Sequence, residues 1–321
     1  MIKLINGDCL IESDKIESGS VDLILTDLPY GTVKDLGNSD TIQHGMKGKT
    51  EWDSVIDTDK IMQIANRILR KNGKMILTAQ QPFTNELLNK ALPNLPFSYS
   101  MIWEKDHFAN ALTAKKAPLN YYEDILIFSK GDCYKAKHPL RNIMYKYVQR
   151  YGIEHLVSLF LNEGRYTSKL SARVHAGYKF GFNKGLRFDL MNEKMYNYLI
   201  YFIEFEETFK ELKAIDTEYK EKYCSTFNLW EGNKVKSNIL KYKKDYTGHH
   251  PTQKPVLLLE DLIKTFSNSG DLVVDLTMGS GSTGVAAKNT NRNFIGIELD
   301  ETYFNIAKDR LEAHQIQANL I

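Results

Sequence analysis

The sequence predicts an α/β protein with a mostly parallel sheet. Two observations carry this prediction: short buried strand patterns alternate with helical patterns near both ends of the chain, and turn residues follow several of the strands. Strands separated by helices of about 10–15 residues are typical of βαβ units, whose strands run parallel. The strand candidates are Ile2–Ile5, Val21–Thr26, Lys74–Ala79, Tyr99–Trp103, Asp124–Ser129, Leu272–Leu276 and Asn293–Glu298.

Apolar residues at helical spacing lie between these strands. The polar run from Arg70 to Gly73 is expected to end the first helix, and a proline opens the second. The expected helices are Asp59–Leu69, Pro82–Ala91, Val256–Thr265, Ser282–Lys288 and Thr302–Ala313.

The middle of the chain breaks this alternation. We expect residues 131–247 to be an insertion into one α/β domain whose halves are 1–130 and 248–321, with helical stretches such as Met195–Phe209. From Gly131 to Thr247 there are 21 Lys and Arg against 14 Asp and Glu, and this stretch holds 13 of the 18 Tyr, although the net charge of the whole chain is only +2. A basic, aromatic-rich segment suits binding to a polyanion, and a solvated accessory domain is the alternative.

Seven basic residues of this middle segment are candidate DNA contacts, although half or more of such contacts go to phosphate and carry no sequence information. They are Arg141, Arg150, Arg165, Arg173, Lys179, Lys184 and Arg187. We expect Lys105, like Lys115 and Lys116, to be a surface charge, with contact to phosphate as the alternative.

Composition limits the classes of protein that remain. The chain has 321 residues, of which 42% are hydrophobic and 26% charged, as in ordinary globular proteins. It has no run of the roughly 18–20 apolar residues that a bilayer span needs, and its first residues lack an apolar signal core, so we expect a cytoplasmic protein. The three cysteines are scattered, which favours reduced thiols and no metal site.

A glycine-containing turn from Asp275 to Gly284 follows a strand and opens a helix. Its glycines permit close backbone approach, and Ser282 or Thr283 can cap the helix. The next strand ends at Glu298, where a carboxylate can accept hydrogen bonds from both ribose hydroxyls. The pattern favours a cofactor of the adenosine type, and a structural turn or a dinucleotide site are the alternatives.

A second candidate site follows the strand Val21–Thr26, and it consists of Asp27, Leu28, Pro29 and Tyr30. In open α/β sheets ligands bind beyond the carboxyl ends of strands. The Asp27 carboxylate and the Leu28 carbonyl can accept the two N–H groups of an exocyclic amine, and Tyr30 can stack on the base. A turn whose tyrosine closes the core is the alternative. Gln81, Pro82 and Phe83 either line the same pocket or simply begin a helix around a buried ring.

Four motifs together resemble the beta class of DNA amino-methyltransferases. Residues 27–30 (DLPY) resemble the catalytic [D/N/S]-P-P-[Y/F/W], and 275–283 (DLTMGSGST) resemble D-P-F-x-G-S-G-T-T. Residues 250–255 (HPTQKP) match H-P-[T/A]-Q-K-P, and 7–9 (GDC) match G-D-[C/A]. The order, with the catalytic motif first and the cofactor motif last, is that of the beta class, and the resemblance covers about 1–130 and 246–321.

The resemblance implies a Rossmann-like, mostly parallel, seven-stranded sheet of the class I S-adenosylmethionine-dependent methyltransferases, with an inserted target-recognition region. It implies transfer of a methyl group from S-adenosyl-L-methionine to double-stranded DNA, after the target base has been flipped out of the duplex. Asp at the first motif position favours adenine N6, with cytosine N4 as the alternative. An amino-methyltransferase for RNA or protein and a non-catalytic DNA-binding module are further alternatives, and a homodimer is compatible with the class.

The resemblance also assigns site residues and implies no metal. The catalytic residues are Asp27, Leu28, Pro29 and Tyr30. The cofactor-binding residues are Asp8, Cys9, Thr252, Gln253, Lys254, Pro255, Asp275, Thr277, Gly279, Ser280, Gly281, Ser282, Thr283 and Glu298. Among them, Asp8 is implied at the cofactor adenine, and Thr252, Gln253 and Lys254 at the methionine carboxylate. The chain departs from the family pattern at Leu28, which replaces a proline, and at Leu276 and Thr277, which replace proline and phenylalanine.

Overall fold

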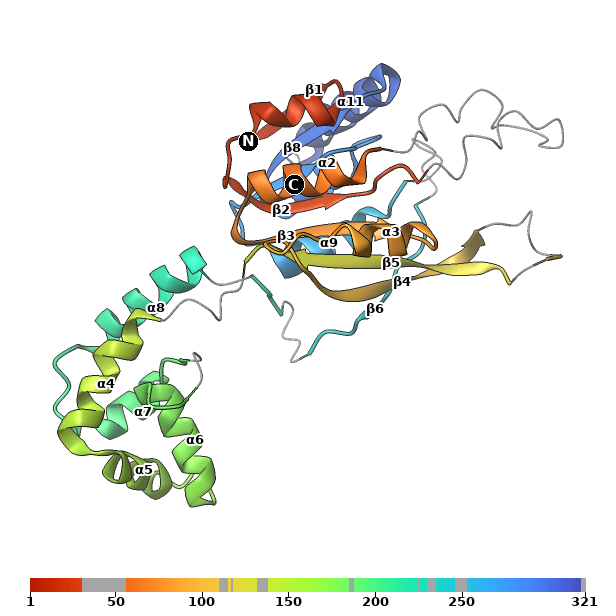
Figure 1. The fold of residues 1–321 in the computed structure, drawn as a ribbon. Coiled ribbons are helices and arrows are strands. Elements are labelled where there is room, and N and C mark those ends of the chain that lie inside the picture. Colours follow the sequence, from red (N-terminus) through yellow and green to blue (C-terminus); the bar gives the residue numbers. More distant parts are fainter. Residues whose placement is uncertain are drawn as a thin grey trace. The chain divides into compact units, whose positions relative to one another are not determined.

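The computed structural model describes residues 1–30, 56–109, 115–116, 118–131, 138–184, 188–223, 226–229, 235–245 and 253–318. The chain divides into two compact units (Figure 1). The first, called here the α/β unit, comprises Met1–Gly131 and Ser225–Ile321. The second, the helical unit, comprises Asp132–Cys224 and lies within the insertion predicted for 131–247.

The described part of the α/β unit contains one eight-stranded sheet with the order β1-β8-β7-β2-β3-β5-β4-β6. Five of its strand pairs are parallel, and the two pairs that involve β5 are antiparallel. The prediction of a mostly parallel α/β sheet is confirmed, with one strand more than the seven expected. The strands are β1 Ile2–Asn6, β2 Val21–Thr26, β3 Leu69–Ala79, β4 Phe97–Ala109, β5 Asn120–Ser129, β6 Ile239–Lys241, β7 Leu272–Asp275 and β8 Asn293–Glu298.

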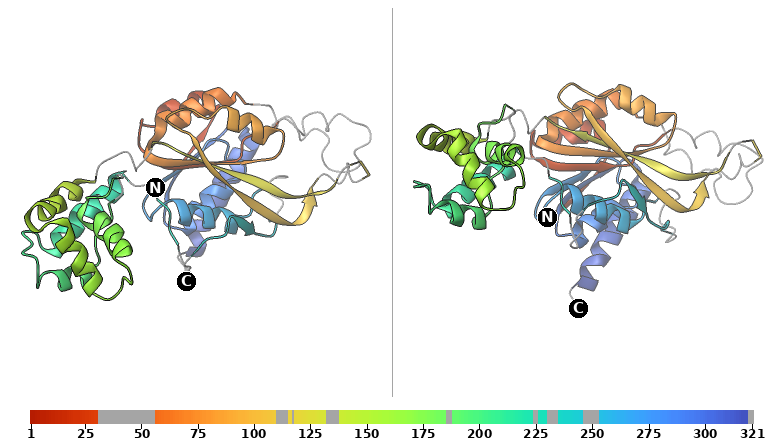
Figure 2. Two further views of the ribbon diagram at one scale, coloured as in Figure 1. Left: turned by 60° about the horizontal axis from the view of Figure 1, so that its bottom comes forward. Right: turned by 90° about the horizontal axis from the view of Figure 1, so that it is seen from below.

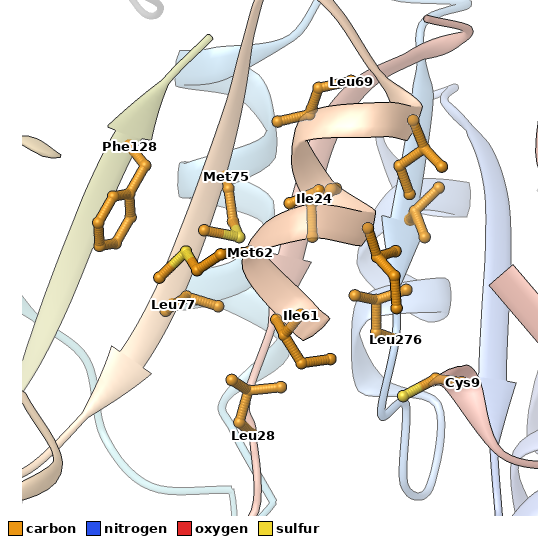
Figure 3. Close-up of a cluster of buried hydrophobic side chains, with 14 of the residues drawn as sticks. Cys9, Ile24, Leu28, Ile61, Met62, Leu69, Met75, Leu77, Phe128 and Leu276 are labelled. Carbon is orange, nitrogen blue, oxygen red and sulfur yellow. The ribbon is translucent and has the colours of Figure 1, made fainter. Parts of the chain in front are cut away.

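Helices cover both faces of this sheet (Figure 2). Successive side chains of a strand point to opposite faces, so each buried strand supplies residues to both layers. On one face, Ile24, Met75 and Leu77 pack with Ile61 and Met62 of α2 (Figure 3). Their strand neighbours belong to the other layer, which packs against α9 and α10. The helices of this unit are α1 Cys9–Glu12, α2 Thr58–Ile68, α3 Phe83–Asn89, α9 Val256–Phe266, α10 Ser282–Asn289 and α11 Glu301–Ala318, with a 3₁₀ turn at Ser13–Lys15.

Helix α2 ends at Ile68, just before the polar run as expected, but the run itself lies inside β3, which begins at Leu69. Val21 pairs with Leu69 but Leu23 pairs with Lys74, so β3 bulges between these positions. Asn72 has a φ of 64° and its backbone N–H donates to the Lys130 carbonyl at 2.6 Å. A bulge lets polar residues interrupt a strand without ending it, and this is why the strand begins at Leu69 and not at the predicted Lys74.

Residues 226–229 and 235–245, assigned from the sequence to the insertion, belong to the α/β unit. The short strand β6 pairs in parallel with β4 at the edge of the sheet. The Trp103 indole N–H donates to the Tyr242 carbonyl at 2.7 Å, and the Tyr242 hydroxyl donates to Asp261 at 2.8 Å. These contacts join the segment to β4 and α9, so the helical unit ends at Cys224, earlier than the predicted 247.

The helical unit has a core of its own, in which Tyr147, Phe160 and Phe180 are fully buried. Its helices are α4 Pro139–Tyr151, α5 Ile153–Asn162, α6 Lys169–Phe180, α7 Glu193–Leu199 and α8 Phe209–Tyr223.

The single helix predicted over Met195–Phe209 is wrong, because α7 ends at Leu199 and α8 begins at Phe209. In between, the backbone N–H of Glu204 donates to the Tyr151 hydroxyl at 3.0 Å and that of Glu206 to the Tyr147 hydroxyl at 2.7 Å. Tyrosines of α4 therefore satisfy amides that a continuous helix would have paired internally.

None of the helices in the described ranges is both long enough and apolar enough to cross a membrane.

We predict that Gly296→Ala destabilises the α/β unit. A Cβ at this position in β8 would lie 2.3 Å from the Met278 sulfur and 2.7 Å from the Phe294 ring. Overpacking of this kind costs about 1–3 kcal/mol, which a urea denaturation curve measures directly.

Met278→Ala provides the control, because it removes the sulfur from the crowded position. In that background the further change Gly296→Ala should cost less than it does in the wild type. An unchanged unfolding midpoint for Gly296→Ala alone would contradict the packing seen here.

Candidate active site

The carboxyl ends of five neighbouring strands, β1, β8, β7, β2 and β3, form one edge of the sheet, because these strands run parallel. Asp8 follows β1, Glu298 ends β8, Asp275 ends β7 and Asp27 follows β2. The two motifs singled out in the sequence, some 250 residues apart, therefore meet at the centre of the sheet, where β7 pairs with β2.

Thr277 joins these two motifs directly. Its hydroxyl donates to the Asp27 carbonyl at 2.9 Å and lies 2.8 Å from the Thr26 hydroxyl. In the family pattern a phenylalanine stands at this position, so the departure noted in the sequence replaces a ring by a hydrogen bond between the catalytic and cofactor motifs.

The Asp27 carboxylate is the best-connected group of the catalytic motif. Its Oδ1 accepts hydrogen bonds from the Tyr30 hydroxyl, at 2.7 Å, and from the Thr78 hydroxyl, and its Oδ2 accepts from the Lys254 ammonium. Its side chain nevertheless remains 27% exposed. A carboxylate held by three donors and still open to solvent is oriented before any ligand arrives.

The other residues of the catalytic motif have simpler surroundings. The Leu28 side chain is buried in the core, while Pro29 and Tyr30 are half-buried. The Tyr30 ring lies 5.2 Å from the Phe83 ring, at an interplanar angle of 39°. Burial, together with the nearby Asp27 charge, raises the pKa of Tyr30, so its hydroxyl stays protonated and able to donate. Phe83 is the first residue of α3 and is buried beside Tyr30, as the helix-start alternative predicted, and a place in the base pocket stays a prediction.

Lys254 has partners that the sequence did not predict. Its ammonium contacts the Asp27 carboxylate and lies 3.3 Å from Glu123 Oε2, and its side chain is only 8% exposed. Burial by itself would lower the pKa of Lys254, but the carboxylates of Asp27 and Glu123 outweigh burial and raise it. A role at the methionine carboxylate stays a prediction of the resemblance; here the ammonium is engaged by two carboxylates of the protein.

Glu123 and Lys105 complete a buried network of charges. Lys105 Nζ lies 2.6 Å from Glu123 Oε1, and both side chains are almost fully buried. Burial would raise the pKa of Glu123, but the ammonium groups of Lys254 and Lys105 hold it below its ordinary value. The expectation that Lys105 is a surface charge is therefore wrong. Two carboxylates and two ammonium groups balance, which offsets the cost of burying charge.

On the cofactor side, Glu298 connects three strand ends through its carboxylate and its backbone carbonyl. Its Oε2 accepts from the Gly279 N–H at 2.8 Å and its Oε1 from the Asp300 N–H at 2.9 Å. The Gly7 N–H donates to the Glu298 carbonyl at 2.9 Å. Burial raises the pKa of Glu298, although these backbone donors oppose the shift.

Asp8 and Cys9 begin α1 on the same edge. Asp8 is the N-cap of this helix and accepts from the Leu10 N–H at 2.9 Å. Cys9 is a buried free thiol, and burial raises its pKa to about 12.

The glycine turn enters α10 without a side-chain cap. Gly281 is the N-cap, with a φ of 80°, and a Cβ there would lie 3.0 Å from the Ala307 Cβ. The expectation that Ser282 or Thr283 caps the helix is wrong, because both are already inside it and buried. Glycine is required because the left-handed backbone and the close approach of α11 leave no room for a side chain.

Arg310 of α11 forms hydrogen bonds with the glycine turn. Its guanidinium donates to the Ser282 hydroxyl at 3.0 Å and to the Ser280 carbonyl at 3.2 Å. Ser280 in turn lies 3.4 Å from the Gln253 amide oxygen, and Gln253 donates to Asp245 at 2.8 Å. Pro255 follows as the N-cap of α9. Thr252 lies outside the described residues.

Sequence reasoning missed Thr78, Glu123 and Arg310, and it assigned Lys105 to the surface. Lys105 and Glu123 flank strand candidates that were drawn too short, at Trp103 and Asp124. Because β4 and β5 extend further, these residues fall inside strands, where polar side chains in buried surroundings are a signal of function.

Comparison with known proteins identifies the family of this chain. The family model N6_N4_Mtase, described as DNA methylase, matches residues 21–309. The chain therefore belongs to the DNA methylase family.

Among its relatives, the type II methyltransferase M2.DpnII of Streptococcus pneumoniae is 43% identical over 86 residues, which cover 27% of this chain and 30% of the relative. The match thus spans under a third of that relative's length. The DNA adenine methyltransferase YhdJ of Escherichia coli (strain K12) is 27% identical over 312 residues, covering 96% of this chain and 82% of the relative. The crystal structure of the M1.HpyAVI–SAM complex has a TM-score of 0.50 at 19% identity, covering 97% of this chain and all of that one, and shares the fold.

We predict that Asp275→Asn stabilises the protein in a pH-dependent way. Burial raises the pKa of Asp275 from its ordinary 3.8 to about 6. The pKa of Asp275 is higher in the folded than in the unfolded state, so ionisation of this side chain destabilises the fold. The full cost applies above pH 6, and it decreases as the pH falls toward 3.8. The variant should gain on the order of 2 kcal/mol at pH 8 and nothing near pH 4.

Thermal unfolding at both pH values measures this difference. Asp309→Asn, at an exposed position on α11, provides a control for the change in net charge. Equal stability of Asp275→Asn and wild type at pH 8 would rule out the proposed cost of ionisation.

Proposed function

We propose that this chain is a DNA methyltransferase that transfers a methyl group from S-adenosyl-L-methionine to an exocyclic amine of a base in duplex DNA, adenine N6. The hydrogen bond from Thr277 to the Asp27 carbonyl carries the proposal, because it holds the candidate cofactor turn against the candidate catalytic motif. Membership of the DNA methylase family supports the activity.

The residues on the β7 and β8 side fit the proposed cofactor. Asp8, Asp275 and Glu298 make this part of the edge rich in carboxylates, which suits a ligand with ribose hydroxyls and a cationic sulfonium. Glu298 uses one lone pair of each oxygen on a backbone N–H and keeps others for the ribose. The cofactor supplies an electrophilic methyl group, and the chain supplies its position.

Asp27 and Leu28 act on the amine of the base. An exocyclic amine is a poor nucleophile because its lone pair is delocalised into the ring. Asp27 Oδ2 and the Leu28 carbonyl accept its N–H groups, pull the nitrogen toward tetrahedral geometry and aim its lone pair at the methyl carbon. A nitrogen–carbon bond forms as the carbon–sulfur bond breaks, its electron pair stays on sulfur, and the amine releases one proton to water. Positioning and electrostatics provide the rate enhancement.

Adenine is favoured over cytosine on two grounds. Aspartate stands at the first position of the catalytic motif, and a relative matched along 96% of this chain is named a DNA adenine methyltransferase. The family itself includes enzymes for both amines.

The helical unit is the proposed target-recognition region. Three of its candidate DNA contacts form ion pairs within the unit, namely Arg150 with Glu204, Arg165 with Glu163 and Arg173 with Glu154. These arginines are well exposed, and exposed ion pairs contribute little stability, so phosphates can replace the carboxylates at low cost. Arg187 lies outside the described residues. The homodimer remains a prediction of the resemblance.

We predict that Asp27→Ala lowers methyl transfer to duplex DNA by about 100- to 1000-fold, as loss of one oriented hydrogen-bonding group at the reacting atom does, while cofactor affinity changes little. Labelled methyl groups from S-adenosyl-L-methionine, offered DNA, RNA and protein in parallel, give the rates, and nuclease digestion of the product identifies the methylated base. Tyr30→Phe keeps the ring and should retain most of the activity. Transfer to RNA or protein but not to DNA would refute the proposed substrate.

We predict that Glu298→Ala weakens binding of S-adenosyl-L-methionine by at least about tenfold, because hydrogen bonds to a charged acceptor are lost. Calorimetric titration measures the affinity. Glu260→Ala, which removes another carboxylate of the α/β unit, should leave the affinity unchanged. If Glu298→Ala binds as tightly as wild type, the ribose is held elsewhere.

A further inference from the structure

The Asp27 carboxylate has one side still open for a ligand. A carboxylate offers about four lone-pair positions, two on each oxygen. Both positions on Oδ1 are taken by the hydroxyls of Tyr30 and Thr78, and Lys254 takes one on Oδ2. Among the described residues, therefore, the remaining acceptor position lies on Oδ2, beside the Lys254 ammonium.

The Lys254 ammonium has an N–H donor available beside this acceptor position on Asp27 Oδ2. An ammonium carries three N–H donors. Within the described ranges its partners are two carboxylates, Asp27 Oδ2 and Glu123 Oε2. An acceptor and a donor thus stand side by side at hydrogen-bonding distance, both belonging to rigidly held groups.

We propose that this pair reads the Watson–Crick edge of the target base: Asp27 Oδ2 accepts from the exocyclic amine, and Lys254 Nζ donates to the ring nitrogen next to it. The inference rests on the proposed function and deepens it. Adenine presents its N6 amine beside the acceptor N1, and cytosine its N4 amine beside the acceptor N3. Guanine and thymine carry an N–H at the matching ring position, which would face the Lys254 ammonium donor to donor.

Glu123 and Lys105 act as positioning residues for this contact. Glu123 bridges the two ammonium groups, 3.3 Å from Lys254 and 2.6 Å from Lys105. Gln80 donates to Glu123 at 3.3 Å, and Asn120 donates to Gln80 at 3.1 Å. Glu123 thereby gives the Lys254 ammonium a second held partner besides Asp27. The role of Lys254 differs from the one that the family resemblance implied, at the methionine carboxylate.

A substrate with a single atom changed tests this contact. In 1-deazaadenine a C–H replaces N1, while the amine is kept. The change makes the amine more electron-rich and weakens pairing with thymine, so chemistry and base flipping would both become easier. A slower reaction must then come from a lost contact with the protein.

The experiment uses the full chain and the duplex in which methylation is found, with the target adenine replaced by 1-deazaadenine, or a target cytosine by 3-deazacytosine. For the wild type we expect kcat/KM to fall about ten- to a hundredfold, as for loss of a hydrogen bond to a charged donor. Lys254→Met should have a lower kcat/KM than the wild type on the natural base. Its kcat/KM on the deaza base should be no lower than on the natural base.

Lys236→Met is the matched control, because Lys236 also forms a buried ion pair, with Asp261 of α9. For this variant the ratio of kcat/KM on the natural base to kcat/KM on the deaza base should equal that of the wild type. Equal kcat/KM of the wild type on both bases overturns the inference, even if Lys254→Met does not fold. A roughly tenfold lower kcat/KM of Lys254→Met on the deaza base than on the natural base also overturns it. Neither result touches the proposed function, which fails separately if no DNA is methylated.

Discussion

The parallel pairing of β2 with β7 at the centre of the sheet is the interaction on which the site depends. It places the ends of two strands, distant in the sequence, side by side. Each strand is followed by a turn that cannot pair further, and Thr277 binds one turn to the other through the Asp27 carbonyl. The residues proposed to hold the methyl donor and those proposed to hold the base are thus fixed relative to each other by backbone hydrogen bonds of the sheet.

The second constraint is the balance of charge beneath the catalytic motif. Asp27, Lys254, Glu123 and Lys105 contact one another in this order and alternate in sign, so each charge faces an opposite one. Such a network contributes less to stability than to geometry, because desolvation consumes most of the attraction. Its consequence for function is an Asp27 carboxylate whose orientation does not depend on a ligand.

The helical unit is held together by different interactions from those of the sheet. Its core is built from helices and aromatic rings, and tyrosine hydroxyls of α4 take over backbone amides in the segment between α7 and α8. The Tyr-rich composition that pointed toward nucleic acid is therefore partly structural, since Tyr147 is fully buried. Its exposed arginines remain the feature that fits DNA.

From the sequence alone one could obtain the α/β class, most strands and helices, and the positions of both motifs at strand ends, because buried strands and turn residues leave local patterns. Asp27, Tyr30, Asp275 and Glu298 were found because each directly follows or ends such a strand. The contacts of Asp27 with Thr78 and Lys254, and of Lys254 with Glu123, could not be found, because these residues come from separate segments and no local pattern says which strands become neighbours. The bulge at Asn72, the extra strand β6 and the break after Leu199 were likewise decided by tertiary hydrogen bonds, which satisfied backbone groups that local rules had left to helix or turn.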